Sequence, residues 1–241
     1  MKIRSRIIPA ILFVLVLGVP VLAQTNDSSV LSSGQTSAET DSVSAPDSTS
    51  GNSYRLKRGD NELGFWAGFS PKATTIFAGL HEDEAADRKF FVAAFRYGRT
   101  LAANEHMALQ YTLDAIPVAI ATGVIVSRTT VGGVTTFQRE TAYGVGLTPA
   151  ALQLDFANSS KVHPFIHVNG GFLGFDKPVP IEDSGQFSFV GEAGGGVRVF
   201  TSERRAVTLG VRFHHISNGN RSGANRGLNQ FVIYAGFSVF K

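Results

Sequence analysis

The sequence predicts an eight-stranded antiparallel β-barrel of the type that spans the bacterial outer membrane. Three observations predict it: eight segments of strand length in residues 54–241, alternating apolar and polar residues within several of them, and connections that are alternately long and short. The chain contains no cysteine, so an exported protein of this size needs stabilisation other than disulfides, for example from a closed sheet.

The N-terminus has the three parts of a secretory signal peptide, which we expect to span residues 1–23. Basic residues form a positive region, residues 7–17 form an apolar stretch, and small residues precede a cleavage site after Ala23. The apolar stretch is too short to cross about 30 Å of hydrocarbon, which favours a signal peptide over an N-terminal anchor helix. We therefore expect an exported protein, located in the cell outer membrane.

Charge gives no indication of a nucleic-acid partner. Three of the 22 lysines and arginines, and none of the 19 acidic residues, lie in the signal peptide, which leaves 19 basic against 19 acidic residues. A nucleic-acid-binding protein needs a basic patch or stripe. Without cysteine, a thiolate metal site is excluded as well.

Residues 24–53 are expected to form a disordered linker before the barrel domain at residues 54–241. The linker contains ten serines, four acidic residues and no aromatic residue. Such a composition cannot bury enough apolar surface to offset the entropy lost on ordering. From Tyr54 onwards the composition shifts to phenylalanine, valine, glycine and alanine.

The barrel domain divides into predicted strands and two kinds of connection. The long connections are residues 71–88, 121–140, 176–186 and 219–229, and the short ones contain turn-forming residues. This alternation is typical of outer-membrane barrels. The eight predicted strands lie at residues 62–70, 89–101, 107–120, 141–156, 162–175, 187–200, 206–218 and 230–240.

The charged residues on the polar strand faces leave a soluble fold open. Glu192, Arg198 and Arg212 suit the interior of a small membrane barrel that carries a charge network. A secreted β-sandwich or a lipocalin-like barrel would instead point its apolar faces inwards and show these charges to water. A porin-like channel is disfavoured, because eight strands leave an interior just wide enough for side chains.

A polar cluster lies near the C-terminus on an otherwise apolar strand face. Counting by two from Val211 places His215 and Ser217 on one face, about 7 Å apart, while His214 points the other way. Asn229 shares the apolar face of the last strand, which should pair with its predecessor as a hairpin. His215, Ser217 and Asn229 should therefore meet on the lipid-facing wall, at the height of the outer leaflet.

These residue types suit acyl transfer. A serine hydroxyl becomes a good nucleophile when a nearby imidazole takes its proton, and a third polar group fixes the imidazole tautomer. The loop NGNRSGANRG could supply oxyanion donors from asparagine side chains and backbone N–H groups. On spacing alone, an asparagine-rich surface loop with incidental histidine and serine remains an alternative.

The stretch FHHISNGNRSGANRGLN resembles the F-x-H-x-S-N…N-x-G motif of the PagL-like lipid A 3-O-deacylases, also called the acyloxyacyl hydrolase family. The upstream stretches PFIHVNGGFLGFDKPVP and GQFSFVGEAGGGVRVF are also similar to that family. The resemblance implies an eight-stranded outer-membrane barrel that removes the ester-linked 3-position acyl chain of lipid A, at an active site on its outer wall. It implies lipopolysaccharide and membrane lipid as partners, and no metal or organic cofactor.

By this resemblance, His215 is the general base and Ser217 the nucleophile. Asn225 matches the asparagine that stabilises the oxyanion, and Asn218 matches the residue that follows the serine and shapes the loop. Asn229 occupies the third position of the triad.

The sequence departs from the family at three positions. Asn229 stands where the best-known members have glutamate, Gly219 where alanine is frequent, and Arg226 where proline is frequent. Asparagine can orient a histidine but cannot stabilise the imidazolium by charge, which suggests lower activity or a different ester. A structural or lipid-binding barrel that has lost catalysis is the alternative, although a decayed site would not be expected to keep every other element.

Overall fold

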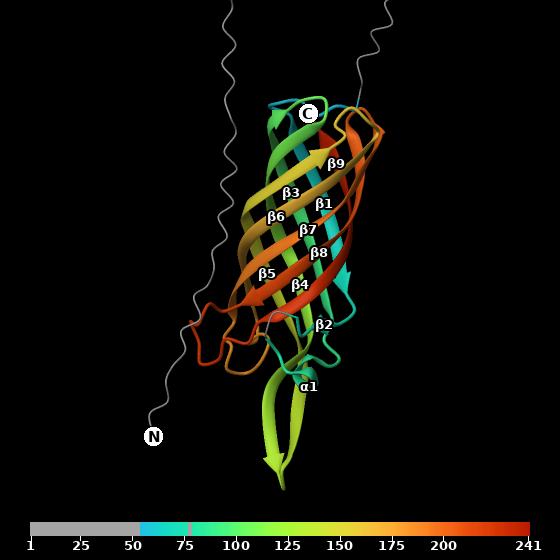
Figure 1. Cartoon of the computed structure of the whole chain (residues 1–241). Coiled ribbons are helices and arrows are strands. Elements are labelled where there is room, and N and C mark those ends of the chain that lie inside the picture. The colour runs from blue at the N-terminus through green and yellow to red at the C-terminus, as the bar shows by residue number, and fades with distance from the viewer. Residues whose placement is uncertain (1–53, 77–78) are drawn as a thin grey trace, which may run out of the picture. The chain divides into compact units, whose positions relative to one another are not determined.

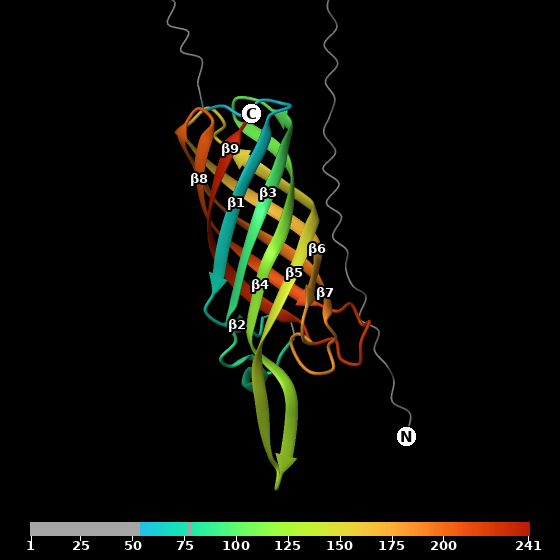
Figure 2. The same cartoon turned by 180° about the vertical axis from the view of Figure 1, so that it is seen from behind.

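The computed structural model describes residues 54–76 and 79–241. The expected signal peptide and serine-rich linker lie outside these described residues. Eight long antiparallel strands form a ring, in which each strand pairs with the next and the last, β9, pairs back with β1 (Figures 1 and 2). The predicted eight-stranded antiparallel barrel is thus confirmed. The strands are β1 (Asn61–Ser70), β3 (Phe90–Ala103), β4 (Met107–Val131), β5 (Val134–Phe156), β6 (Val162–Phe175), β7 (Phe187–Ser202), β8 (Arg205–Ser217) and β9 (Leu228–Phe240).

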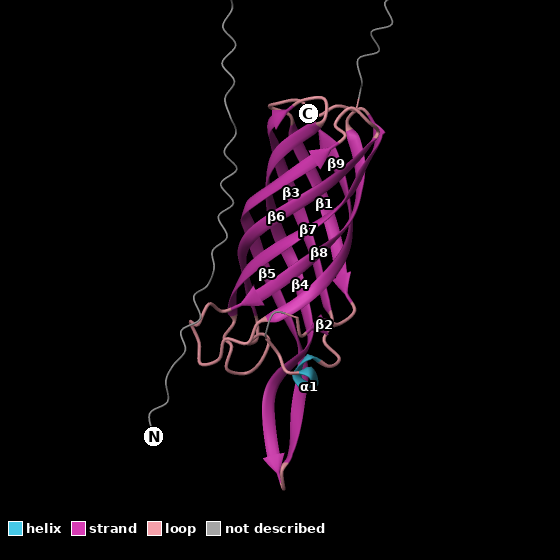
Figure 3. Cartoon of the chain, viewed as in Figure 1, coloured by secondary structure: helices cyan, strands magenta, loops and turns pink. Residues whose placement is uncertain are grey.

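Two short elements in the β1–β3 loop were not predicted. β2 (Ala73–Thr74) pairs with the start of β9, and α1 (Glu82–Ala85) is a single helical turn (Figure 3). The described residues contain no helix that is both long and apolar enough to cross a membrane.

The long connections gather at the end of the barrel opposite the C-terminus (Figure 1). The short turns and the C-terminus lie together at the other end. In outer-membrane barrels the short turns face the periplasm and the long loops face outwards.

The prediction that residues 121–140 form a loop was wrong. β4 continues to Val131 and β5 starts at Val134, so the two strands form a hairpin arm that extends beyond the other loops (Figure 2). Gly132 and Gly133 have φ values of 56° and 82°, as required at the centre of a tight two-residue hairpin turn. The other strand bounds differ from the prediction by two residues at most.

The outer strand faces are apolar, and the interior holds the buried charged residues together with a buried apolar cluster. Leu63, Phe95 and Ile233 are 60%, 65% and 63% exposed on the outer wall. Arg198 and Arg212 are fully buried in the interior. This polarity is that of a membrane barrel and is the reverse of the one expected for a lipocalin-like barrel or a sandwich.

Ion pairs and aromatic rings fill the interior. Arg198 donates to Glu62 and Asp155, both at 2.9 Å, and Arg96 pairs with Asp114 at 2.8 Å. This is the charge network expected from the polar strand faces. Side chains therefore occupy the space that a porin-like channel would need.

Candidate active site

The polar residues predicted on β8 and β9 come together at the long-loop end of the barrel. In the strand register, His215 lies opposite Asn229 of β9 and Ser217 lies opposite Phe189 of β7. His215 and Ser217 are partly buried on the outer face of β8, whereas His214 is fully buried on the inner face. The opposite orientation of the two histidines follows from strand alternation.

The side chain of Asn229 holds the imidazole of His215. Its Oδ1 accepts a hydrogen bond from His215 Nδ1 at 2.5 Å, and its Nδ2 donates to the carbonyl of Ile76 at 2.6 Å. Because an amide oxygen can only accept, the imidazole proton must be on Nδ1. The neutral ring therefore presents Nε2 as a proton acceptor.

Asn229 does not face lipid, contrary to the expectation from strand alternation alone. The residue shares the outward face of β9, but β2 pairs with β9 at this point, with Thr74 opposite Asn229. The β1–β3 loop thereby covers the residue, which is only 1% exposed. The His215–Asn229 hydrogen bond is consequently shielded from competition with solvent.

A surface pocket of about 430 Å³ brings the candidate reactive groups together. It is open to the outside and combines polar and apolar lining. The pocket has no room for a side chain at Gly227, where a Cβ atom would lie 2.8 Å from Cε1 of His215. The lining residues are Gly79, His215, Ser217, Asn225, Arg226 and Gly227.

Asn218 lies behind the pocket and organises the loop. Its buried side chain donates to the carbonyls of Ser184 and Ala224, both at 2.7 Å, and accepts from the backbone N–H of Asn220 at 2.9 Å. These bonds join the β8–β9 loop to the β6–β7 loop. Asn218 thus touches loop backbone and does not line the pocket, which is the geometry of a loop-shaping residue.

Residues 107–238 match the family model described as lipid A 3-O-deacylase (PagL). The chain belongs to this family. The match covers more than half of the chain, from β4 to β9, and includes His215, Ser217 and Asn229. Family membership, together with the apolar outer wall, identifies an outer-membrane β-barrel.

Solved structures similar to this chain include three from outer-membrane proteins. The crystal structure of the outer membrane enzyme PagL is 14% identical, with a TM-score of 0.45 and coverage of 73% of this chain and 97% of that one. OprG from Pseudomonas aeruginosa is 14% identical, with a TM-score of 0.44 and coverage of 78% and 98%. Neisserial surface protein A is 13% identical, with a TM-score of 0.42 and coverage of 75% and 96%. No curated protein sequence matches the chain.

Three contributors to the pocket were not predicted from the sequence. The Ile76 carbonyl binds Asn229, Gly79 lines the pocket, and Arg226 reaches from the β8–β9 loop towards the β1–β3 loop. Arg226 Nη1 lies 3.5 Å from the Gly79 carbonyl oxygen and 3.9 Å from the Glu84 carboxylate. A backbone carbonyl such as that of Ile76 leaves no signal in a sequence.

Two arginines fasten the β1–β3 loop to the rest of the outer rim. Arg88 donates to the carbonyls of Glu84 and Pro180, at 2.6 and 2.8 Å. Arg139 donates to four carbonyls, that of Glu84 again and three others, including that of Asp83 at 2.6 Å. Burial, and then the charge of Arg139, lower the pKa of Arg88 to about 10, so its side chain stays charged at neutral pH.

Aromatic rings flank the pocket on the outer wall. Phe187 and Phe189 of β7 meet edge to face at 5.3 Å between centroids, and the guanidinium of Arg221 lies 5.6 Å from the Phe187 centroid. On the other side, Phe213 and Phe231 meet at 5.5 Å. Both pairs are partly exposed. The pocket thus opens onto an apolar wall suited to an acyl chain.

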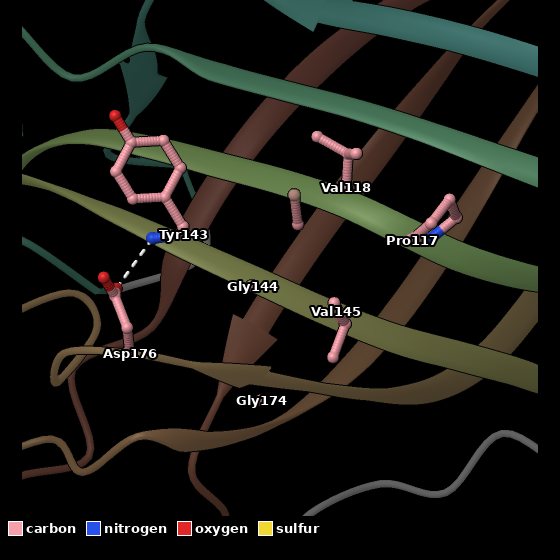
Figure 4. A pocket seen from close by; sticks show the side chains of 8 residues that line it. Pro117, Val118, Tyr143, Gly144, Val145, Gly174 and Asp176 are labelled. Atoms are coloured by element: carbon pink, nitrogen blue, oxygen red, sulfur yellow. Dashed lines mark hydrogen bonds between the residues drawn. The ribbon is translucent and has the colours of Figure 1, made fainter.

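A second pocket, of about 380 Å³, lies on the wall formed by β4, β5 and β6 (Figure 4). Apolar side chains and glycines line most of it, and Asp176 accepts a hydrogen bond from the backbone N–H of Tyr143 at 2.7 Å. Its lining contains no serine and no histidine. Of these two pockets, only the one at Ser217 is lined by both a serine and a histidine.

The described part of the chain holds no group of three or more histidine, aspartate or glutamate side chains placed to bind one metal ion.

Proposed function

We propose that the protein is an outer-membrane serine esterase that hydrolyses the 3-O-linked acyl ester of lipid A. The observation that supports this most is the hydrogen bond between His215 Nδ1 and Asn229, which fixes the orientation of the imidazole. Nε2 is then the free basic atom of a ring that lines the same pocket as Ser217 and Asn225. The pocket lies at the loop end of the lipid-facing wall, where an outer-leaflet lipid presents its acyl esters. Membership of the lipid A 3-O-deacylase family supports the same substrate.

In the first half of the reaction, Ser217 Oγ attacks the carbonyl carbon of the ester while His215 Nε2 takes the hydroxyl proton. Asn225 and backbone N–H groups of the β8–β9 loop stabilise the resulting oxyanion. The intermediate then collapses, and the bond between the carbonyl carbon and the sugar oxygen breaks. The sugar oxygen leaves with the proton from His215, so that lipid A regains a free hydroxyl and Ser217 keeps the acyl group.

In the second half, water releases the acyl group. His215 Nε2 removes a proton from the water, which attacks the acyl-serine carbonyl carbon. Collapse of this second intermediate returns the proton to Ser217 Oγ and liberates the fatty acid. Asn229 keeps the imidazole in the same orientation throughout both steps.

The alternative is a lipid-binding or structural barrel without catalysis. The amide at Asn229 favours it, because the imidazolium formed in each step receives no charge stabilisation from a neutral group. A catalytic site with this amide is expected to be slower than one with a carboxylate in the same orientation.

Mass spectrometry of lipid A from an outer-membrane host distinguishes the two functions. We expect the host expressing the wild type to lose the mass of one acyl chain from lipid A, and the host expressing Ser217→Ala to retain it, because only the wild type forms the acyl-serine. A heat-shift gel serves as the folding control for both proteins. Unchanged lipid A with a folded wild-type barrel would favour the non-catalytic function.

A further inference from the structure

The amide of Asn229 is bound at both ends. Its oxygen accepts from His215 Nδ1, and its nitrogen donates to the Ile76 carbonyl at 2.6 Å. The residue is 1% exposed, so neither end is bound to bulk water instead. Ile76 belongs to the β1–β3 loop, outside the residues that match the family model.

An amide and a carboxylate are not equivalent at this position. The amide offers one acceptor and one donor group, whereas an ionised carboxylate offers acceptors alone. A carboxylate at position 229 would place an acceptor oxygen against the Ile76 carbonyl oxygen. A buried acceptor without a donor is destabilising.

We propose that the Ile76 carbonyl is the positioning group that orients Asn229, so that this site requires an amide rather than a carboxylate at position 229. The β1–β3 loop then belongs to the active site, because it supplies the carbonyl that orients Asn229. The expected effect of this orientation on the reaction rate rests on the proposed esterase function.

The orientation of the amide determines the tautomer of His215. If the amide were reversed, its nitrogen would face His215 and Nδ1 would have to accept, which would move the ring proton to Nε2. A ring protonated at Nε2 cannot take the serine proton, and the wrong tautomer accounts for a loss of about 10⁴-fold when the triad aspartate of serine proteases is changed to asparagine. The Ile76 carbonyl prevents this reversal, because the reversed amide would oppose two oxygen atoms.

Contacts around the loop hold the Ile76 carbonyl in place. A Cβ atom at Gly79 would lie 2.6 Å from the Gly227 carbonyl oxygen and 3.4 Å from Nδ2 of Asn229, so the loop packs directly against the site. Titratable and charged side chains around this pocket among the described residues include His215 of β8, Arg226 of the β8–β9 loop, which lines the pocket, and Glu84 of α1, which pairs with Arg226.

The variant Asn229→Asp tests the proposal, because it keeps the size of the side chain and removes the donor. We expect its deacylase rate on purified lipid A at pH 7.5 to fall at least about tenfold below that of the wild type. We also expect the ratio of variant to wild-type rates to rise as the pH falls towards 5.5. A protonated aspartic acid regains a donor for Ile76 while still accepting from His215.

The opposite pH response would overturn the proposal. If a negative charge beside His215 matters more than the Ile76 carbonyl, Asn229→Asp will exceed the wild type at pH 7.5. Its advantage will then shrink on acidification, because the carboxylate favours the protonated imidazole. Asn220→Asp is the matched control: it adds the same charge to an exposed position of the same loop and should leave the rate unchanged.

A second readout separates this proposal from the esterase function. The ¹⁵N NMR spectrum of histidine-labelled wild-type protein in detergent micelles, assigned with His215→Gln, reports which ring nitrogen bears the proton. We expect Nδ1–H in the wild type. A wild type with Nδ1–H and no deacylase activity would contradict the esterase function alone, whereas an Nε2–H ring would contradict the orientation of Asn229.

Discussion

His214 and His215 are neighbours in the chain but serve opposite sides of the barrel wall. The ring of His214 points inwards, where Nδ1 meets the carboxylate of Glu192 and the ring lies 4.9 Å from that of Phe90. The ring of His215 points outwards to Asn229 and the pocket. Because successive side chains of β8 point to opposite faces, adjacent histidines have different roles: His214 packs inside the barrel and His215 is the proposed catalytic base.

This contrast predicts opposite effects for one substitution at the two positions. His215→Gln should lower the deacylase rate by about 10²–10⁴-fold, the usual contribution of a general base, and should leave unfolding unchanged. His214→Gln should retain most of the activity and lower the denaturant midpoint of unfolding, because it weakens the buried contact with Glu192. Rates on purified lipid A and unfolding in detergent measure the two effects. Equal loss of activity in both variants would contradict the assignment.

At the residue scale, strand alternation predicts the strand face of each side chain of the site, but not that the β1–β3 loop covers Asn229. His215, Ser217 and Asn229 were predicted on the outer face from counting by two, and the structure has them there. The hydrogen bond to Ile76 could not be predicted, because it depends on how a distant loop folds over β9. The path of a loop over the barrel wall depends on tertiary contacts, and such contacts leave no periodic pattern in the sequence.

At the scale of elements, the β1–β3 loop forms one wall of the pocket. β2 pairs with β9, Gly79 lines the pocket, and α1 carries the Glu84 carboxylate that faces Arg226. Arg88 and Arg139 fix the loop to the rim through backbone carbonyls. The loop is consequently held by polar contacts at several points along its length.

Gly79→Ala should displace this loop while leaving the identities of His215, Ser217 and Asn229 unchanged. The new Cβ atom would lie 2.6 Å from the Gly227 carbonyl oxygen, so the backbone must move on one side of the pocket. We expect a loss of activity that approaches 10²-fold, because a displacement of about 1 Å at a catalytic group can cost that much. Initial rates on lipid A measure it.

Gly174→Ala is the control for that variant. Its Cβ atom would meet no other atom within 4 Å, so we expect the rate to remain at the wild-type level. A normal rate in Gly79→Ala would show that the β1–β3 loop is not needed for the geometry of the pocket.

The hairpin arm shows where prediction from the sequence failed at this scale. Its residues are rich in threonine and valine, which favour strands, but they were interpreted as a loop because outer-membrane strands average about ten residues. Pairing between β4 and β5 continues beyond the barrel, because the backbone hydrogen bonds of a two-stranded ribbon need no third strand. The arm also makes an ion pair between Arg128 and Glu182 at 2.6 Å.

At the scale of the whole barrel, buried ion pairs lie in the interior together with a cluster of buried apolar side chains. Arg212 is fully buried, donates to Glu192 at 2.9 Å, and packs over two aromatic rings, 3.9 Å from the Trp66 centroid and 4.1 Å from that of Tyr234. Removal of one partner from such a pair leaves a buried charge without compensation.

Arg212→Met should therefore destabilise the barrel by about 3–5 kcal/mol, because it leaves the Glu192 carboxylate without its arginine partner. Adding Glu192→Gln to Arg212→Met should recover part of that loss, since the double variant contains no uncompensated carboxylate. Denaturant unfolding of the refolded barrels in lipid vesicles measures both free energies. Identical losses in the single and double variants would show that the ion pair contributes nothing specific.

Much of the architecture of the barrel domain could be predicted from the sequence, because a membrane barrel imposes simple constraints. Every strand must alternate between lipid and interior, and every backbone group must find a partner in a closed ring. The positions of Glu192, Arg198 and Arg212 inside the barrel follow from the same alternation. What the sequence could not provide is the arrangement of the long loops, which determines the shape of the pocket.

The central claim, that Ser217 hydrolyses an acyl ester of lipid A, is tested most directly with purified components. Folded wild-type protein and Ser217→Ala are incubated with lipid A in detergent micelles, and both products are quantified by mass spectrometry. We predict that the wild type releases fatty acid and shortened lipid A in equal amounts, and that Ser217→Ala releases neither. Release that persists in Ser217→Ala, or none from the folded wild type, would contradict the claim.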